Sequence, residues 1–74
     1  MLLWTDYPLV ELGDQPNTPA PQRRCTLLSY DGNKYCTVLI DGNSFSIKRG
    51  YIYYLPIRDV GRSVSHQDAM RYYK

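Results

Sequence analysis

Two glycine turns, each set between runs of β-branched and aromatic residues, constrain the fold of this chain more than any other feature. Asp31-Gly32 opens the first turn, and Gly42-Asn43 forms the second. Asp-Gly and Gly-Asn pairs supply the positive φ angles that tight hairpin turns require. We therefore predict a three-stranded antiparallel meander. Its strands cover residues 25–30, 35–41 and 44–49.

Side-chain alternation divides this meander into two faces. The first turn, over residues 31–34, places Leu27 opposite Val38. The second turn places Ile40 opposite Phe45. Because the side-chain period of a strand is two, another turn length would change these partners and leave the faces unchanged. The predicted core face collects Cys25, Leu27, Cys36, Val38, Ile40, Phe45 and Ile47, and the predicted outer face collects Thr26, Leu28, Tyr30, Tyr35, Thr37, Leu39, Ser46 and Lys48.

The two cysteines, Cys25 and Cys36, belong to the predicted core face and are not expected to form a disulfide. In this register they are offset along the sheet by roughly four residues, or about 13 Å at the rise of a strand. A disulfide requires Cα atoms within about 7 Å of each other. Both thiols are therefore predicted to be small buried apolar side chains, which favours a reducing compartment and a cytoplasmic protein.

The chain before the meander contains a strand and a long loop. Residues 4–12 mix aromatic and β-branched side chains, and Pro8, which lacks a backbone donor, favours an edge strand or an extended arm. Residues 13–22 contain three prolines and almost no apolar side chain. They are predicted to form a loop with polyproline character, which is long for so small a domain and is a candidate functional loop.

The chain after the meander is predicted to contain a helical turn, a short strand and a helix. Gly50 ends the third strand of the meander, and a tight helical turn is expected over residues 51–55. Residues 57–58 are expected to form a last short strand. Ser65 can then cap a short helix over residues 66–73.

This order of elements is similar to that of SH3-like small barrels. Residues 13–22 take the place of their long first loop, and residues 50–55 take the place of their single helical turn. The resemblance covers residues 3–58 and rests on element order, since the acidic long loop and the aromatic signature of peptide-binding SH3 domains are missing. It implies an all-β SH3-like barrel over residues 1–58, followed by a linker and a short C-terminal helix or tail over residues 59–74. It supports a fold and not a ligand, and a five-stranded OB-like barrel is the alternative architecture.

Length and charge exclude several classes of protein. A chain of 74 residues is one domain at most. No apolar run approaches the ~18–20 residues of a membrane span, and the first residues lack the basic region of a signal peptide. Residues 1–22 carry a net charge of −3 and residues 23–74 a net charge of +5. This charge asymmetry, with an acidic N-terminal segment beside a basic remainder of the chain, can steer an anionic partner. Alternatively, the two parts of the chain simply pair with and neutralise each other.

The sequence contains no pattern typical of catalysis or of cofactor binding. His66 is the only histidine, and the serines have no evident base partner. Phosphate loops, dinucleotide fingerprints and CxxC pairs are absent, and two cysteines with one distant histidine do not have the spacing of a metal site. We therefore expect a protein that is not an enzyme, with no metal and no cofactor.

Tyrosine is unusually frequent in this chain, which contains eight of them. Its flat ring and its hydroxyl, which tolerates water, suit binding surfaces. Aromatic side chains interleaved with Lys and Arg are typical of proteins that bind single-stranded nucleic acid, because rings stack on bases and cations contact phosphates. The predicted binding residues are Tyr30, Lys34, Tyr35, Lys48, Arg49, Tyr51 and Tyr53. Ordinary packing of Tyr30 against Tyr35 across the hairpin would explain part of this pattern equally well.

An apolar patch on the outer face supports an alternative partner. Leu28 and Leu39 share this face, and Trp4 is nearby in the sequence. Such a patch is typical of a surface that binds a larger protein or a second copy of the chain. The alternative function is therefore that of a small accessory or inhibitor protein, of the kind that phages and mobile elements encode, acting by protein–protein interaction.

Overall fold

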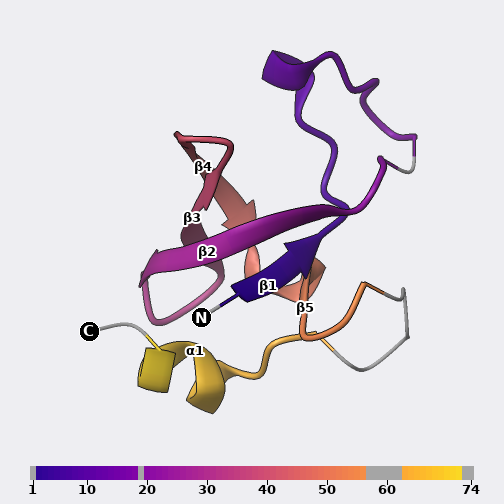
Figure 1. The fold of residues 1–74 in the computed structure, drawn as a ribbon. Helices are drawn as coiled ribbons and strands as arrows, with labels where there is room; N and C mark the ends of the chain where they lie inside the picture. Colours follow the sequence, from indigo (N-terminus) through magenta and orange to yellow (C-terminus); the bar gives the residue numbers. More distant parts are fainter. Residues whose placement is uncertain (1, 19, 57–62, 73–74) are drawn as a thin grey trace.

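The computed structural model describes residues 2–18, 20–56 and 63–72. These residues form one antiparallel sheet of five strands, two 3-10 turns and one helix (Figure 1). The strands are β1 (Leu2–Thr5), β2 (Arg23–Tyr30), β3 (Tyr35–Ile40), β4 (Asn43–Lys48) and β5 (Ile52–Tyr53), the 3-10 turns are η1 (Val10–Leu12) and η2 (Arg49–Tyr51), and the helix is α1 (His66–Tyr72). The predicted all-β class with a short C-terminal helix is confirmed.

The sheet is open and does not close into the expected barrel. Its strands lie in the order β4-β3-β2-β1-β5, so that β4 and β5 are its two edges. These two edges do not pair with each other in the described ranges of the chain. Closure would require β5, which pairs with β1, to pair with β4 as well, and β5 has only two residues. Figure 1 shows α1 at one end of the sheet and the segment that contains η1 at the opposite end.

The predicted meander is confirmed as β2, β3 and β4. In the first turn, the Asp31 carboxylate accepts hydrogen bonds from the backbone N–H groups of residues 33, 34 and 35 at 2.7, 2.9 and 3.2 Å. Leu27 pairs with Val38 as expected. An aspartate at the start of a tight turn satisfies backbone donors that would otherwise be unpaired. These hydrogen bonds hold the pKa of Asp31 below its usual value.

The second turn lies one residue earlier than predicted. Asp41 and Gly42 have φ angles of 50° and 83°, which are the two positive values of a type I′ turn. Val38 therefore pairs with Phe45, and the register predicted for β3 and β4 was wrong by two residues. Because the shift is an even number, the faces are those expected from the sequence.

Replacing Gly42 by alanine is expected to destabilise the protein by about 1–2 kcal/mol, the cost of placing an L-residue in the left-handed region. A Cβ atom on Gly42 would meet no other atom within 4 Å, so backbone strain alone determines this cost. Gly50→Ala is the matched control, since Gly50 also has open space and does not have a positive φ. Denaturant unfolding of both variants measures the difference, and equal stabilities would contradict the type I′ assignment.

A bulge in β2 changes the face on which Tyr30 lies. Leu27 pairs with Val38, but Ser29 pairs with Thr37, so that β2 contains one extra residue at position 28. Tyr30 is consequently turned toward the core and is only 4% exposed. The predicted position of Tyr30 on the outer face was wrong. The other expected core residues of the meander are buried, with Phe45 partly buried against them.

The first strand is an interior strand, and its prediction as an edge or an arm was wrong. It pairs with β2 on one side and with β5 on the other. It also ends at Thr5, so that Pro8, which suggested an edge, lies outside the ladder. The residues after Pro8 form η1, and the predicted loop over residues 13–22 contains no strand or helix in its described part.

The structure between residues 49 and 56 also differs from the prediction. The helical turn is η2, two residues earlier than expected, and Ile52 and Tyr53 form β5. Ile52 is buried in the core, and its apolar side chain explains why the chain returns to the sheet at this point. The strand predicted at residues 57–58 and the boundary predicted between residues 58 and 59 lie outside the described residues.

The C-terminal helix is capped as predicted and packs against the sheet. The Ser65 hydroxyl accepts a hydrogen bond from the Asp68 N–H at 3.1 Å. Val64 and Ala69 are 1% and 0% exposed and belong to the same apolar cluster as the strands. The Tyr54 hydroxyl donates a hydrogen bond to the Asp68 carboxylate. The helix is therefore part of the core, and it is too short to cross a membrane, as is every helix in the described part of the chain.

Both cysteines are free and buried, in agreement with the prediction. Burial raises the pKa of the Cys25 thiol and of the Cys36 thiol to about 11. At neutral pH both therefore remain protonated, and a protonated thiol is a poor nucleophile and a poor metal ligand. They pack as small apolar side chains.

Candidate binding groove

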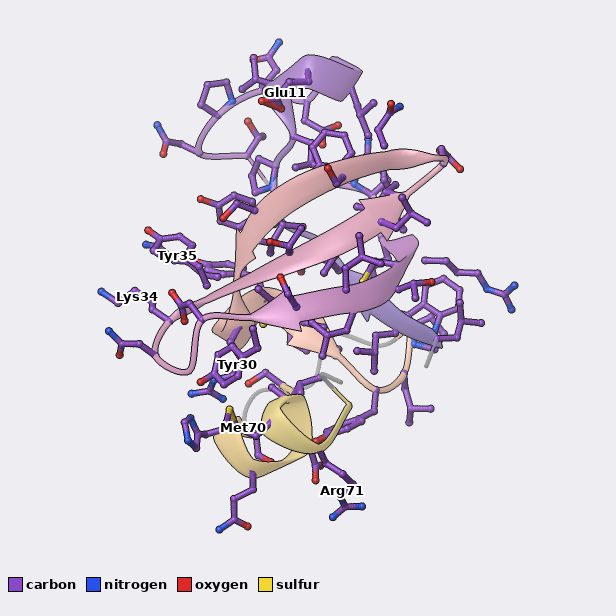
Figure 2. All side chains as sticks on the ribbon, turned by 90° about the vertical axis from the view of Figure 1, so that its left-hand side faces the viewer. Glu11, Tyr30, Lys34, Tyr35, Met70 and Arg71 are labelled. Carbon is purple, nitrogen blue, oxygen red and sulfur yellow. The ribbon has the colours of Figure 1, made fainter. Side chains whose placement is uncertain are left out.

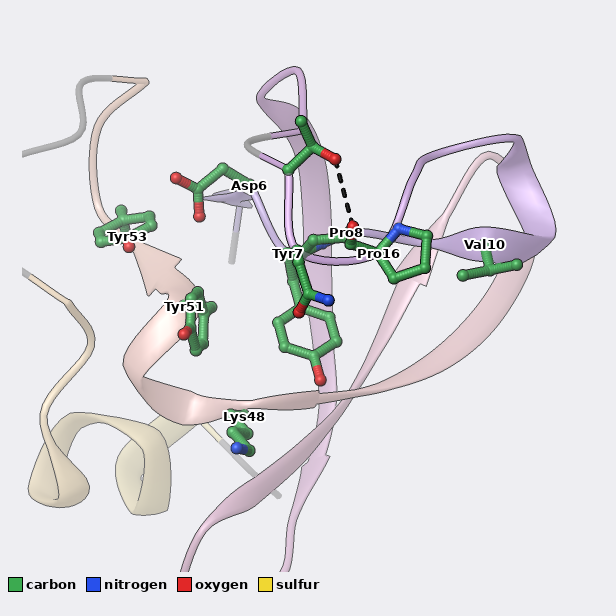
Figure 3. Close-up of a pocket in the computed structure, with 10 residues that line it drawn as sticks. Asp6, Tyr7, Pro8, Val10, Pro16, Lys48, Tyr51 and Tyr53 are labelled. Atoms are coloured by element: carbon green, nitrogen blue, oxygen red, sulfur yellow. Dashed lines mark hydrogen bonds between the residues drawn. The ribbon is translucent and has the colours of Figure 1, made fainter.

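A groove opens between the segment that follows β1 and the chain where β4 passes into η2 and β5 (Figure 3). Its volume is ≈ 660 Å³. Three tyrosines and two prolines dominate its walls, so we name it the tyrosine groove. It is lined by Asp6, Tyr7, Pro8, Val10, Pro16, Asn17, Thr18, Lys48, Tyr51 and Tyr53.

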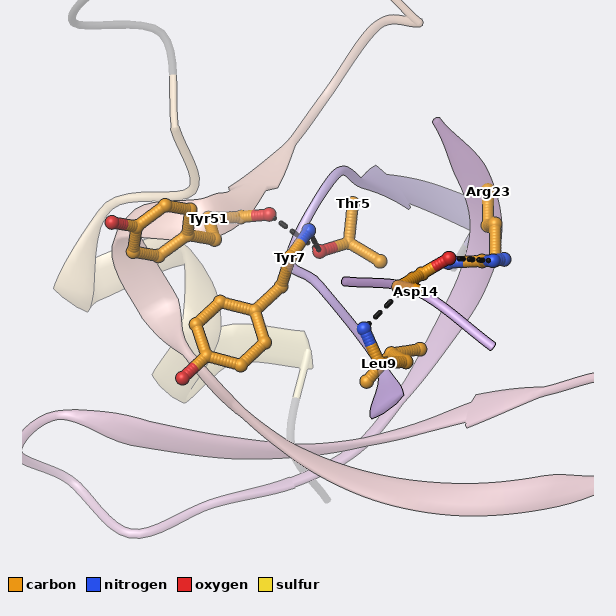
Figure 4. Close-up of polar contacts among 6 residues, drawn as sticks. All are labelled: Thr5, Tyr7, Leu9, Asp14, Arg23 and Tyr51. Carbon is orange, nitrogen blue, oxygen red and sulfur yellow. Dashed lines mark hydrogen bonds and ion pairs between the residues drawn. The ribbon is translucent and has the colours of Figure 1, made fainter. Parts of the chain in front are cut away.

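One buried hydroxyl group fixes the two aromatic walls of the tyrosine groove. The Thr5 Oγ1 donates a hydrogen bond to the Tyr51 carbonyl oxygen at 2.7 Å and accepts one from the Tyr7 N–H at 3.2 Å (Figure 4). Thr5 is only 1% exposed. The rings of Tyr7 and Tyr51 lie edge to face, with centroids 5.0 Å apart and an interplanar angle of 71°. The two backbone segments that carry these rings are therefore held side by side.

An ion pair holds the loop that forms the third wall. The Asp14 carboxylate accepts two hydrogen bonds from the Arg23 guanidinium, at 2.6 and 2.8 Å, and a third from the Leu9 N–H at 2.7 Å (Figure 4). Arg23, and then the Leu9 N–H, lower the pKa of Asp14 from 3.8 to about 2. Leu9 itself is buried in the core. The start of the loop is thus attached both to β2 and to the core.

Replacing Asp14 by asparagine is expected to remove a pH-dependent part of the stability. Because the pKa of Asp14 is about 2 in the folded chain against 3.8 ordinarily, the unfolded chain takes up this proton first as the pH falls. The stabilisation is therefore complete above about pH 4 and is lost as the pH approaches the folded value. Denaturant unfolding between neutral and acidic pH should show the wild-type and Asp14→Asn curves converging below that pH. A difference in stability that does not change with pH would contradict this assignment.

The structure brings three of the seven predicted binding residues together in the tyrosine groove: Lys48, Tyr51 and Tyr53. Arg49 is half-buried, and its guanidinium donates a hydrogen bond to the Val64 carbonyl at 2.6 Å, so this cation links η2 to the segment before α1. The other three predicted residues, Tyr30, Lys34 and Tyr35, lie outside the groove.

Lys34 and Tyr35 remain exposed at the turn between β2 and β3, and Figure 2 shows them projecting from one end of the sheet. Tyr35 pairs with Lys48 across β3 and β4. Tyr30 is in the core, where its hydroxyl hydrogen-bonds with His66 Nδ1 at 2.7 Å and donates to the Asn33 carbonyl at 3.2 Å. The predicted surface is therefore divided between the tyrosine groove, the first turn and the core.

Sequence reasoning missed Tyr7, Pro8 and Pro16 as binding residues. A signal for them existed, since Tyr7 and Pro8 are adjacent in an aromatic segment and Pro16 belongs to the loop already singled out for its length. What the sequence could not supply was the contact between Thr5 and Tyr51, which are separated by 46 positions. That contact places the two segments side by side.

A second hollow lies next to the groove, along β4. Its volume is ≈ 400 Å³, and it lies between the segment 7–11 and Ser44, Phe45 and Ser46 of β4. Tyr7, Pro8 and Val10 line both spaces, so the two are adjacent.

The charged side chains that line the groove are Lys48 and Asp6. Among the residues that the structure describes, no group of three His, Cys, Asp or Glu side chains could hold a metal ion. His66 is engaged with Tyr30 and is not among the residues that line the groove. The thiols are buried in the core. Comparisons with protein-family models, curated proteins and solved structures gave no match.

Proposed function

We propose that this chain is a non-catalytic binding module and that its tyrosine groove binds an extended segment of a partner protein. The observation that carries the proposal is the edge-to-face pair of Tyr7 and Tyr51, held by the buried Thr5 hydroxyl. Tyr51 is 42% exposed, so its ring is available to a ligand. Rigid tyrosine side chains supply contact area at a low cost in conformational entropy, and they are enriched where proteins bind other proteins.

The order of elements supports an SH3-like arrangement as the finer description of the fold. A 3-10 turn joins β4 to β5, which is the order of elements that the sequence resemblance implies. In the structure β5 pairs with β1. The tyrosine groove then lies between the long first loop and this 3-10 turn. We also infer a reducing, cytoplasmic location from the two free, buried thiols.

The charges around the groove favour a polypeptide over a nucleic acid. Several arginines are already committed within the chain. Arg23 pairs with Asp14, Arg49 with the Val64 carbonyl, Arg71 with Asp68, and Arg24 lies over the Trp4 ring. Lys48 is the one Lys or Arg among the described groove-lining residues, and Asp6 lies on the same groove. Binding of a phosphate backbone requires several cations in a row, because its affinity comes largely from released counterions.

Single-stranded nucleic acid is the second candidate, and one observation favours it. Lys34, Tyr35 and Lys48 are exposed close to one another, and neither lysine forms an ion pair within the described ranges. Stacking on Tyr35 with phosphate contacts to the two lysines would give binding that weakens steeply with salt.

Selection of random linear peptides on the immobilised chain tests the proposal. We expect enrichment of peptides whose affinity changes little when the salt concentration is raised. The same selection on the Tyr51→Ala variant should not enrich them. Failure to enrich any peptide above background, or equal enrichment on both proteins, would overturn the proposed function. Salt-sensitive binding of an oligonucleotide in place of peptides would support the second candidate.

A further inference from the structure

The strand β4 is an edge of the sheet that borders both parts of the groove. It pairs with β3, and no loop or turn of the described ranges pairs with its other side. An edge strand presents a row of backbone N–H and C=O groups that a further extended chain can pair with. The question is therefore which residues of β4 offer these groups.

The turn at one end of β4 indicates which residues of the strand direct their backbone N–H and C=O groups toward β3. Residues on either side of a two-residue type I′ turn form a hydrogen-bonded pair, and here these residues are Ile40 and Asn43. In an antiparallel ladder, hydrogen-bonded and non-hydrogen-bonded pairs alternate. Phe45 and Ile47 therefore also direct their backbone groups toward β3.

The opposite end of β4 independently identifies the same set of residues. The Arg49 N–H donates a hydrogen bond to the Lys34 carbonyl at 2.8 Å. Residue 49 therefore directs its N–H toward β3, and in an antiparallel ladder every second residue does the same. Residues 47, 45 and 43 thus also face β3, in agreement with the turn. The backbone groups of Ser44, Ser46 and Lys48 consequently point away from β3, and all three residues are exposed.

The space beside these outward groups belongs to the groove. Ser44 and Ser46 line the second hollow, and Lys48 lines the adjacent tyrosine groove. An added strand lies ~4.8 Å from its neighbour, so a chain paired with β4 would occupy the hollow and lead into the tyrosine groove. The charges differ at the two ends of this path, with Lys48 at one end and Glu11 at the other.

We propose that the partner segment adds a strand to the edge of β4 and pairs with the backbone groups of Ser44, Ser46 and Lys48. This inference rests on the proposed function, since it states how a protein segment is held beside the tyrosine groove. By charge complementarity, the segment carries an acidic side chain near Lys48 and a neutral or basic one near Glu11. It carries no proline at the positions that pair with β4, because proline cannot donate a ladder hydrogen bond.

A proline at position 48 tests the proposal. Lys48 has φ −64° and ψ 134°, and proline fixes φ near −65°, so the substitution matches the present backbone. It removes the outward N–H without removing a bond to β3. Lys48→Ala is the matched control, because it also removes the amine and keeps the N–H. Both variants should keep the wild-type melting temperature, and Lys48→Pro should bind a selected peptide about two- to tenfold more weakly than Lys48→Ala.

Amide hydrogen exchange read by NMR gives a second test that does not depend on a variant. In the unliganded chain the amides of Ser44, Ser46 and Lys48 should exchange quickly, and those of Phe45 and Ile47 slowly. The same selected peptide should slow exchange at Ser44 and Ser46 and leave Phe45 little changed. A uniform exchange rate along β4 in the unliganded chain would contradict the assignment of the Ser44, Ser46 and Lys48 amides as pointing away from β3.

The outcomes separate this inference from the proposed function. If a selected peptide binds and loses affinity in Tyr51→Ala, but binds Lys48→Pro and Lys48→Ala equally and leaves Ser44 and Ser46 unprotected, strand addition is wrong and the groove proposal stands. If no peptide binds, both fail. Protection of Ser44 and Ser46 that grows with protein concentration alone would mean that a second copy pairs with β4, which also overturns the proposal.

Discussion

The variant Tyr51→Ala is expected to bind a selected peptide about 30-fold or more weakly than the wild type, with its stability little changed. The Tyr51 ring forms a wall of the tyrosine groove, is 42% exposed and lies edge to face with Tyr7. Truncation of a central tyrosine in a binding site costs about 2 kcal/mol or more, which is the stated loss in affinity. The structural hydrogen bond from Thr5 goes to the Tyr51 backbone carbonyl, which alanine retains. Fluorescence anisotropy of a labelled peptide measures the change.

The variant Tyr35→Ala is the matched control for this experiment. Tyr35 is 41% exposed, almost the same as Tyr51, but it is not among the residues that line either part of the groove. Its replacement should leave the affinity for the peptide within about twofold of the wild type, as for residues outside a binding site. Equal losses in the two variants would contradict the assignment of binding to the tyrosine groove and would favour the surface around Lys34.

The variant Tyr30→Ala is expected to destabilise the protein by about 3–5 kcal/mol, the usual cost of removing a large aromatic ring from a core. Tyr30 is 4% exposed and contacts both the first turn and His66 through its hydroxyl. Tyr30→Phe keeps the ring and removes only the hydrogen bonds, so its expected cost is about 0.5–1.5 kcal/mol. Denaturant unfolding of both variants measures the two contributions separately.

A loss of this size would unfold much of the population, because so small a domain is only marginally stable. Tyr30→Phe then shows whether the ring position is correct without losing the fold. A Tyr30→Ala protein as stable as the wild type would contradict the burial of this side chain and the bulge that causes it.

The meander could be predicted from sequence because its information is local. Turn glycines and alternating apolar residues determined the strands and the core face, and both are confirmed. The bulge at residue 28 has no such signal, since neither a glycine nor a proline lies between Leu27 and Tyr30. Tyr30 is held by His66, 36 positions away along the chain. A contact of that kind overrides the strand period and cannot be read from neighbouring residues.

The candidate site was only partly predictable for the same reason. Lys48, Tyr51 and Tyr53 were found because aromatic and basic residues are adjacent there in the sequence. Tyr7 was missed because the interior position of β1, between β2 and β5, depends on pairing between segments far apart in the chain. The frequency of tyrosine in the sequence does not show which rings are accessible to a partner. In the structure Tyr51 is 42% exposed, whereas Tyr30 is 4% exposed.

An amide-resolved NMR titration of the wild-type chain tests the groove most directly. The labelled protein is titrated once with a peptide from the selection and once with a mixed-sequence single-stranded oligonucleotide, at low and at moderate salt. We expect the peptide to shift the amides of Tyr7, Val10, Lys48, Tyr51 and Tyr53 at both salt concentrations, and the oligonucleotide to leave them unchanged. Shifts that appear only with the oligonucleotide, centre on Lys34 and Tyr35 and fade as salt is raised would contradict the tyrosine groove as the site of binding.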